Sequence, residues 1–435
     1  MDISLIAALM FLCMFALLAV GLPVAFCLGA TGVIFALAFS PRSLPVLASG
    51  FFGTPYVEII LTLPMFVLMG NLIRYSGIAE AAYDMAYKLI GGLGGGLAMG
   101  TTVICTLFAA ITGIIPPATM TMGMIAVPSM LKHGYDKLMA VGSVAAGGAL
   151  ADLIPPSGGM IFYALLAKES VGKLFMGGVM PGLLLATLYM VYIGIRCKLQ
   201  PHLGPPIPPE EKVPWGERIL SIYAIWPFLV LIFLVLGIIY MGVATPPEAA
   251  CFGAAGACLI NAIYRKLTRQ VLKDALSTTV DLSVMGLWIL IGAYFFVNIF
   301  SALGCRELVA TAVTGIPGGK WAAIAMMLGI VLILGCVMDD WAIITLVTPL
   351  YTPIVVALGF TKLWFGIILI MTIQTAFLTP PFGWVLFCLK SVLPKEITMG
   401  DVYRSVIPFV LLQLVGLTLV IIFPQIGLWL PGTMK

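Results

Sequence analysis

Four segments of the chain place proline, glycine and oxygen-bearing side chains inside otherwise apolar runs. They read Thr112-Gly113-Ile-Ile-Pro116-Pro117-Ala-Thr119, Asp152-Leu-Ile-Pro155-Pro156-Ser157-Gly158, Gly335-Cys-Val-Met-Asp339-Asp340 and Thr375-Ala-Phe-Leu-Thr379-Pro380-Pro381-Phe-Gly383. Proline has no N–H and blocks the preceding helical turn, so each break leaves backbone carbonyls without a helical partner. Carbonyl, hydroxyl and carboxylate oxygens are hard ligands, and they suit a small alkali cation such as Na⁺.

The breaks therefore predict cation sites, unless they are proline kinks whose freed groups are satisfied by neighbouring helices. We expect the cation ligands to come from Thr112, Gly113, Asp152, Pro155, Ser157, Gly335, Asp339, Thr375, Thr379 and Gly383. Asp339 and Asp340 lie beside the third break, where they either serve a second cation site or form a solvated helix end. An ionisable residue at membrane depth is costly and is therefore a functional candidate.

Composition decides what surrounds these breaks. Of 435 residues, 62% are hydrophobic and 9% are charged, against about 25% charged in an average soluble domain. A soluble globular protein is excluded, and at about 20 residues a span the chain has room for roughly a dozen passages through a lipid bilayer. The sequence predicts an all-α polytopic membrane protein.

Several classes of chemistry lack the residues that they need. Two histidines and nine cysteines without CxxC spacing exclude an HExxH zinc site. The segment Gly315-Ile-Pro-Gly-Gly-Lys320 lacks the spacing of a phosphate-binding loop, so ATP hydrolysis is not predicted. The formal charge of +4 comes from residues scattered singly through loops, and nucleic acid is not an expected partner.

The chain divides into two similar halves. The proline-rich, polar stretch 196–220 separates a first repeat, residues 1–195, from a second, residues 221–435. At offsets of 224 to 227 the same residues recur in the same order, including Asn71 with Asn298, Gly77 with Gly304, Gly134 with Gly359, Pro155-Pro156 with Pro380-Pro381 and Pro181 with Pro408. Such a series indicates internal duplication.

Charge indicates that the repeats are inverted. After the matched second spans, loop 41–57 carries one basic residue, Arg42, whereas 263–280 carries four, Arg265, Lys266, Arg269 and Lys273. Under the positive-inside rule the matched loops lie on opposite faces, with 196–220 and 265–273 in the cytoplasm and both chain ends outside. Inverted repeats with broken helices at the midplane are typical of secondary transporters.

Four motifs in order resemble the large membrane subunit of tripartite ATP-independent periplasmic (TRAP) transporters over residues 5–430. They are Met69-Gly-Asn-Leu-Ile-Arg-Tyr-Ser-Gly77, Pro128-Ser-Met-Leu-Lys-His-Gly134-Tyr135-Asp136, Leu-Ile-Pro155-Pro156-Ser157 and Leu-Thr379-Pro380-Pro381-Phe-Gly383. The resemblance implies an elevator transporter of the ion transporter superfamily, with scaffold helices and a mobile transport domain built around two re-entrant hairpins. It implies Na⁺ coupling in the bacterial inner membrane. It also implies a small four-helix membrane subunit and a periplasmic binding protein that delivers a small organic acid.

Two departures from the family pattern concern the first site. The family usually has Ser-Gly-Ser where this chain has Thr112-Gly113-Ile114, and Gly with an aliphatic residue where it has Ala151 and Asp152. Asp152 either replaces the missing hydroxyls as a cation ligand or pairs with a basic group at a hairpin tip. Arg306 either meets a substrate carboxylate or extends its side chain to the interface. The substrate contacts expected with this resemblance are Thr119, Ser157, Gly158, Arg306, Thr379 and Pro381.

Two other classes remain as alternatives. A stand-alone ion-coupled carrier or antiporter of the same superfamily would transport without a soluble partner. A membrane enzyme would need a cluster of His, Cys or paired carboxylates, for which the sequence offers Asp339 and Asp340. The sequence predicts a transporter and not an enzyme, and it leaves the substrate unidentified.

Overall fold

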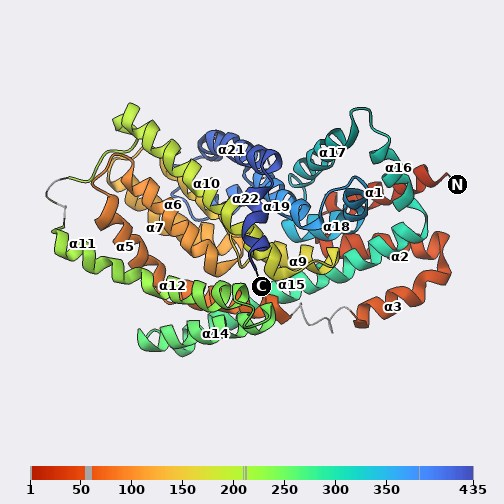
Figure 1. Ribbon diagram of the computed structural model, residues 1–435, viewed down its shortest axis with the longest axis horizontal. Coiled ribbons are helices and arrows are strands. Elements are labelled where there is room, and N and C mark those ends of the chain that lie inside the picture. The colour runs from red at the N-terminus through yellow and green to blue at the C-terminus, as the bar shows by residue number, and fades with distance from the viewer. Residues whose placement is uncertain (1, 54–60, 209, 211–212, 382, 435) are drawn as a thin grey trace.

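The computed structural model describes residues 2–53, 61–208, 210, 213–381 and 383–434, and every regular element in these ranges is helical. The predicted all-α fold is therefore confirmed. The first residues of the span expected at 58–73, and Lys212 in the linker, lie outside the described residues. Figure 1 shows an elongated bundle with the N-terminus at one end of its long axis.

Helices of the first half end at the proline and glycine positions that the sequence singles out. Their bounds are α1 (Ile3–Ala19), α2 (Val24–Phe39), α3 (Leu44–Gly53), α4 (Thr62–Tyr75), α5 (Ile78–Ile90), α6 (Gly96–Thr112), α7 (Ile115–Lys132), α8 (Lys137–Ala149), the 3₁₀ turn η4 (Leu150–Asp152), α9 (Gly158–Ala167) and α10 (Val171–Leu199). The linker predicted at 196–220 is partly helical, because α10 continues to Leu199 and α11 begins at Trp215.

The second half repeats this order. Its bounds are α11 (Trp215–Ser221), α12 (Trp226–Ile232), α13 (Ile238–Tyr240), α14 (Pro246–Ile263), α15 (Arg269–Ala302), α16 (Cys305–Thr314), α17 (Gly319–Leu334), α18 (Asp340–Ala357), α19 (Lys362–Leu378), α20 (Trp384–Lys390), α21 (Met399–Ile422) and α22 (Gln425–Gly432).

Matched glycines share their backbone conformation. Gly77 and Gly304, 227 residues apart, precede α5 and α16 with φ of 78° and 77°. Gly134 and Gly359, 225 residues apart, follow α7 and α18 with φ of 77° and 84°. Such left-handed φ values favour glycine. Both pairs of matched glycines therefore adopt the same turn conformation, as expected if the two halves are repeats.

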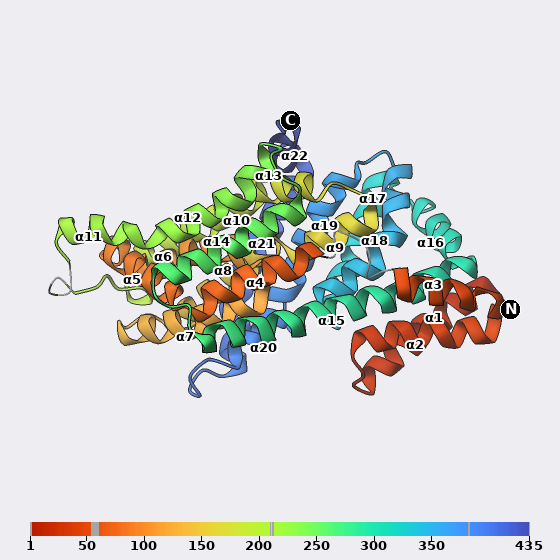
Figure 2. The same cartoon turned by 90° about the horizontal axis from the view of Figure 1, so that it is seen from below.

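The helices pack in two groups that each draw on both halves. In the frame (α1–α5 and α11–α16), α2 and α4 pack against α15, and α4 also packs against α14. In the inner group (α6–α10 and α17–α22), α8 packs against α21 and α9 against α18. In Figure 2 the long helix α15 of the frame passes beside α4 and α2, and it also packs against α18 of the inner group. Neither half could form its core alone.

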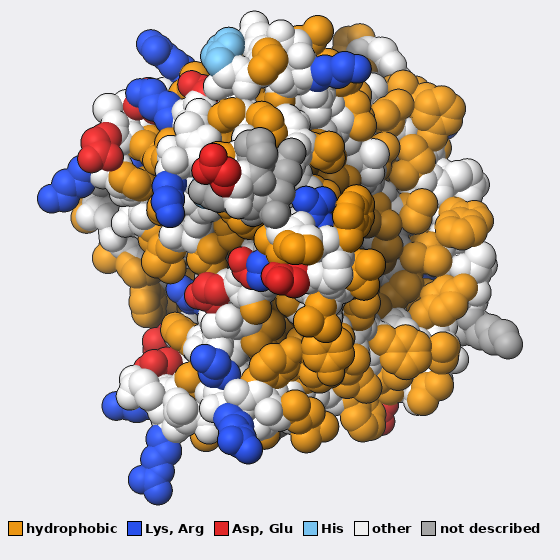
Figure 3. Space-filling model, turned by 90° about the vertical axis from the view of Figure 1, so that its left-hand side faces the viewer, with side chains coloured by type: hydrophobic (Ala, Val, Ile, Leu, Met, Phe, Trp, Pro, Cys, Tyr) orange, Lys and Arg blue, Asp and Glu red, His pale blue; other side chains and the backbone are white. Residues whose placement is uncertain are grey.

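Length and apolar composition qualify several helices as membrane spans. Among the described residues, five uninterrupted helical segments are long and apolar enough: 171–199, 215–240, 269–302, 340–357 and 399–422. Six shorter apolar helices accompany them, among them α6, α9 and α19. Charged side chains gather at the end that carries α11 and the C-terminus of α10, while hydrophobic side chains cover one flank (Figure 3).

Candidate functional site

The first two breaks meet in space. Gly113, with φ of 61°, ends α6, and its carbonyl accepts a hydrogen bond of 3.1 Å from the N–H of Gly158 at the start of α9. A Cβ on Gly113 would come within 2.1 Å of the Pro156 carbonyl oxygen, so only glycine fits this contact. The Pro155–Pro156 bond is cis. One carbonyl that the sequence analysis treats as free is thus already hydrogen-bonded, because the α6–α7 tip rests on the loop before α9.

Asp152 lies inside this junction. It ends η4 with 1% of its surface exposed, and its Oδ1 accepts a weak hydrogen bond of 3.4 Å from the Ser157 hydroxyl. Ser157 in turn accepts a 3.2 Å hydrogen bond from the Met160 N–H and caps α9. Oδ2 of Asp152 is buried and has no hydrogen-bond partner among the described residues. An unpartnered carboxylate oxygen at this depth needs a cation or a proton.

The third break brings further carboxylates to Asp152. Asp340, in the first turn of α18, interacts electrostatically with both Asp152 and Asp339. Asp339 caps α18, because its Oδ1 accepts a 2.7 Å hydrogen bond from the Ala342 N–H. The two salt bridges within the described ranges, Lys88–Asp84 and Lys137–Asp401, lie elsewhere. Asp152 therefore has no basic partner in the described part of the chain, contrary to one of the two expectations for it.

The third and fourth breaks also pack against each other. A Cβ on Gly335, which ends α17, would come within 2.3 Å of the Ala376 Cβ on α19. Thr375 precedes Ala376 on α19 and Thr379 caps the end of this helix, and each hydroxyl donates a 2.7 Å hydrogen bond to the carbonyl four residues earlier. Thr112 does the same at the first break, at 3.0 Å. Because each O–H is used as a donor, its oxygen keeps lone pairs that can bind a cation.

An aromatic pair covers one side of the carboxylates. The rings of Phe162 and Trp341 are stacked, with centroids 5.0 Å apart and planes 23° apart. Trp341 also lies against Gly158, where a Cβ would come within 3.1 Å of its ring. Both rings abut Gly286 on α15, so they fill the space between the breaks and the frame.

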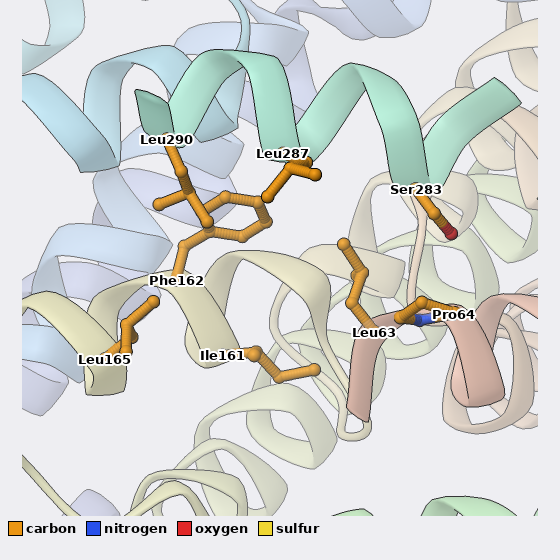
Figure 4. Close-up of a pocket in the computed structure, with 8 residues that line it drawn as sticks. All are labelled: Leu63, Pro64, Ile161, Phe162, Leu165, Ser283, Leu287 and Leu290. Atoms are coloured by element: carbon orange, nitrogen blue, oxygen red, sulfur yellow. The ribbon is translucent and has the colours of Figure 1, made fainter. Parts of the chain in front are cut away.

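Where α9 faces the frame, the contact is apolar. A cavity of about 20 Å³ is lined by Leu63 and Pro64 of α4, by Ile161, Phe162 and Leu165 of α9, and by Ser283, Leu287 and Leu290 of α15. Figure 4 shows these side chains pointing into the space between the three helices. Only the Ser283 hydroxyl is polar in this lining, and it donates within α15 to the Thr279 carbonyl at 2.6 Å. No directional bond ties α9 to α15 at this cavity.

The structure leaves some predicted site residues apart from this cluster. Arg306 lies in the first turn of α16 in the frame, and no hydrogen bond or ion pair with a break residue is found for it in the described ranges. Thr119 is fully buried on α7 against Gly148 of α8, and its hydroxyl has no described partner. The Pro381 carbonyl accepts a 2.7 Å hydrogen bond from the Tyr403 hydroxyl. The Gly383 carbonyl accepts from the Leu386 N–H at 2.9 Å.

The sequence-based ligand set misses other residues that the fold brings to the site. Asp340 is expected with Asp339 at a second cation site or a solvated helix end, whereas the structure gives it an electrostatic interaction with Asp152. Gln374 is fully buried beside Thr375, and neither of its amide atoms has a described partner. Gln374 can be singled out from the sequence, because it is a polar residue within an otherwise apolar segment.

These oxygens fit a hard cation better than a transition metal. The junction offers two interacting carboxylates, Asp152 and Asp340, and the hydroxyl of Ser157. Among the described residues no group of three His, Cys, Asp or Glu side chains is arranged to hold a metal ion. Carboxylate, hydroxyl and carbonyl oxygens without nitrogen or sulfur select hard cations.

Comparison with known proteins bears on what such a site does. Residues 11–426 match the family model described as the tripartite ATP-independent periplasmic transporter, DctM component. The chain is 32% identical over 407 residues to the C4-dicarboxylate TRAP transporter large permease protein DctM of Pseudomonas aeruginosa, covering 93% of each chain. It is 31% identical over 421 residues to the isethionate TRAP transporter permease protein DctMQ of Oleidesulfovibrio alaskensis, covering 95% of this chain and 65% of that protein. The solved YdaH transporter of Alcanivorax borkumensis has a similar fold, with a TM-score of 0.61 at 13% identity over 91% of this chain and 90% of that one.

Proposed function

Because this chain belongs to the DctM component family of tripartite ATP-independent periplasmic transporters, we propose that it imports a small organic acid across the bacterial inner membrane, driven by Na⁺. In this proposal it is a transporter subunit that works with a periplasmic binding protein and a small four-helix membrane subunit. The observation that carries the Na⁺ coupling is the buried Asp152 beside the partly buried Asp340, since neither has a basic partner among the described residues.

The substrate class is supported by two relatives. Their names give C4-dicarboxylate for one and isethionate for the other, and both substrates are small organic anions. The junction of the breaks presents the N-terminal ends of α9 and α18 on adjacent elements. Helix N-termini favour anions, so a bound anion there would neighbour the cations held by the carboxylates.

Na⁺ would be held by two sets of residues. The first set is Asp152, Ser157 and the α6–α7 tip at Thr112 and Gly113, with Asp340 beside it. The second set is Thr375 and Thr379 of α19, with the α17–α18 tip at Gly335 and Asp339. A bound Na⁺ supplies the positive charge that both carboxylates lack. Each set joins a helix tip to a broken helix, so cation binding would fix both hairpins at once.

An elevator movement is supported by the kind of contact between the two helix groups. At α9 the inner group meets α4 and α15 through apolar side chains, with no directional bond at the cavity of Figure 4. Apolar packing is non-directional, so one body can shift along another without losing specific bonds. We assign the frame to the scaffold and the inner group to the moving body.

The test is uptake into proteoliposomes that contain this chain with its small subunit and its binding protein. With substrate-loaded binding protein outside, we expect uptake only when a Na⁺ gradient is present. Uptake that persists with choline in place of Na⁺ would contradict the coupling. Uptake of free substrate without any binding protein would instead identify a stand-alone carrier.

A further inference from the structure

A larger cavity lies along the same contact between frame and inner group. It has a volume of about 410 Å³ and is bounded by α3 and α15 on one side and by α9 and α18 on the other. This volume falls in the range of small-molecule sites. The stacked Phe162 and Trp341, which abut Gly286, come earlier along α9, α18 and α15 than the residues that line it. The cavity is therefore distinct from the site at the breaks.

One charge faces this cavity. Among the described residues that line it, the exposed Lys168 alone is charged, and its side chain forms no hydrogen bond or ion pair with the described part of the chain. Lys168 follows α9 with a left-handed φ of 53°, which is uncommon for a residue other than glycine. Its N–H donates to the Ala164 carbonyl, and the neighbouring Ala167 carbonyl accepts a 3.0 Å hydrogen bond from Lys362 Nζ. Two hydrogen bonds, one at Lys168 and one at Ala167, thus hold the backbone that carries the Lys168 side chain.

The remaining wall is mostly hydrocarbon. Leu165 and Leu166 of α9, Leu290 and Val297 of α15, and Pro349 of α18 form its apolar part. Tyr294 also lines the cavity, and its ring rests on Gly50 of α3, where a Cβ would come within 1.9 Å of a ring carbon. One cation at the edge of an apolar wall matches a ligand with one anionic end and an apolar body. Ser49, Asn298 and Thr345 add uncharged polar groups to the lining, but none of its residues offers a second cation for a dicarboxylate.

We propose that this cavity binds an amphipathic monocarboxylate, such as a medium-chain fatty acid, with its carboxylate on Lys168 and its chain along Leu165, Leu290 and Val297. The ligand bridges the frame and the inner group. Any effect of the ligand on movement of the inner group against the frame rests on the proposed function. Binding of the ligand to the cavity does not.

The experiment measures binding by photolabelling of the purified full-length chain in phosphatidylcholine nanodiscs. The probe is decanoic acid with a diazirine on its chain, and labelled peptides are mapped by mass spectrometry. We expect labelling within 161–168 and 286–298, competed by decanoate but not by decanol. Lys168→Gln should lower this labelling about fivefold, the upper range for a partly exposed ion pair. The matched control is Lys173→Gln on α10, an exposed lysine outside the cavity, and it should leave labelling unchanged.

A second variant distinguishes loss of binding from misfolding. Val297→Trp fills the cavity from the frame side and should abolish labelling, while the melting temperature shows that the chain is folded. Equal labelling of wild type and both cavity variants would overturn the proposal. Decanol competing as well as decanoate would also overturn it, because this would indicate that the probe partitions into the lipid. Competition by succinate at the concentration of decanoate would also overturn it, because the cavity would then belong to the substrate path. The experiment does not measure transport. Its outcome therefore does not decide whether import is coupled to Na⁺, which the proteoliposome uptake assay tests separately.

Discussion

At the scale of single residues, the central feature is a pair of carboxylates from opposite halves of the chain. Asp152 follows α8 and Asp340 begins α18, and the two interact within the described structure without a basic side chain between them. Two like charges in a poorly solvated place repel each other and lose hydration. The sequence left two roles open for Asp152, and the acidic surroundings favour the role of cation ligand over that of an ion-pair partner.

We expect Asp152→Asn to raise the Na⁺ concentration for half-maximal uptake about tenfold, which corresponds to about 1.4 kcal/mol. The melting temperature should not fall, because the change removes one of two repelling charges. The measurement is Na⁺-dependent uptake together with a thermal melt of the purified variant. Glu169→Gln, at the end of α9, is the matched control and should change neither. A lower melting temperature with an unchanged Na⁺ midpoint would assign Asp152 a purely structural role.

Thr379→Val replaces the hydroxyl of a proposed Na⁺ ligand by a methyl group of similar size. We expect a several-fold higher Na⁺ midpoint, because the lone pairs of the hydroxyl are lost, and a stability cost of about 1 kcal/mol for the helical hydrogen bond. Thr418→Val is the control, since its hydroxyl makes the same 2.7 Å bond to the carbonyl four residues earlier, on α21 away from the breaks. If both variants shift the Na⁺ midpoint equally, Thr379 is not a ligand.

At the scale of elements, the tips of helix pairs rest on broken helices. The α6–α7 tip contacts the loop before α9 through Gly113, and α17 ends against α19 through Gly335. The breaks themselves could be predicted from sequence, because proline and glycine act on their own backbone. The partners of each break could not, because the contacting segments lie more than 40 residues apart. The two roles left open for Arg306, which lies on α16 in the frame, stay predictions.

We expect Gly113→Ala to destabilise the contact between the α6–α7 tip and the α9 loop. The loss of stability should exceed the cost of the left-handed backbone conformation alone. A Cβ there meets the Pro156 carbonyl oxygen at 2.1 Å, so the tip must move off the α9 loop. Gly134→Ala is the control, because its φ of 77° is similar but the nearest atom lies 3.7 Å from the added Cβ. We expect the control to cost about 1–2 kcal/mol from the left-handed backbone and to keep transport. The Gly113 variant should lose more stability and most Na⁺-dependent uptake. Equal effects in melting and uptake assays would show that the tip contact is unimportant.

At the scale of the whole molecule, the two halves are interlaced rather than side by side. Repetition was predictable, because the matched glycines recur at a nearly constant offset and adopt the same φ. The packing of helices from one half against helices of the other could not be predicted, since sequence offsets carry no information on which helices are in contact. The frame pairs α2 with α15, and the inner group pairs α8 with α21 and α9 with α18. Opposite orientation of the halves in the membrane remains a prediction from the basic residues of the loops.

Cysteine labelling of spheroplasts tests that orientation. In a Cys251→Ser background, which removes the exposed native thiol, a membrane-impermeant maleimide should label a cysteine at Asp2 and not one at Lys273. The reason is that Arg265, Lys266, Arg269 and Lys273 place their loop in the cytoplasm. Permeabilised cells, in which both positions should react, are the control. Labelling at Lys273 from outside would show that the halves are not inverted.

The carboxylate pair without a counter-ion has an electrical consequence for a transporter that must reset. In the proposed cycle, bound Na⁺ would neutralise Asp152 and Asp340, whereas an empty carrier with both ionised would carry net negative charge through the bilayer. The membrane voltage acts on moving charge at about 2.3 kcal/mol per elementary charge per 100 mV. An inside-negative voltage drives such an empty carrier outward, back toward its substrate. The return step should therefore quicken with voltage, and Asp152→Asn should make turnover less voltage-dependent in proteoliposomes clamped with K⁺ and valinomycin.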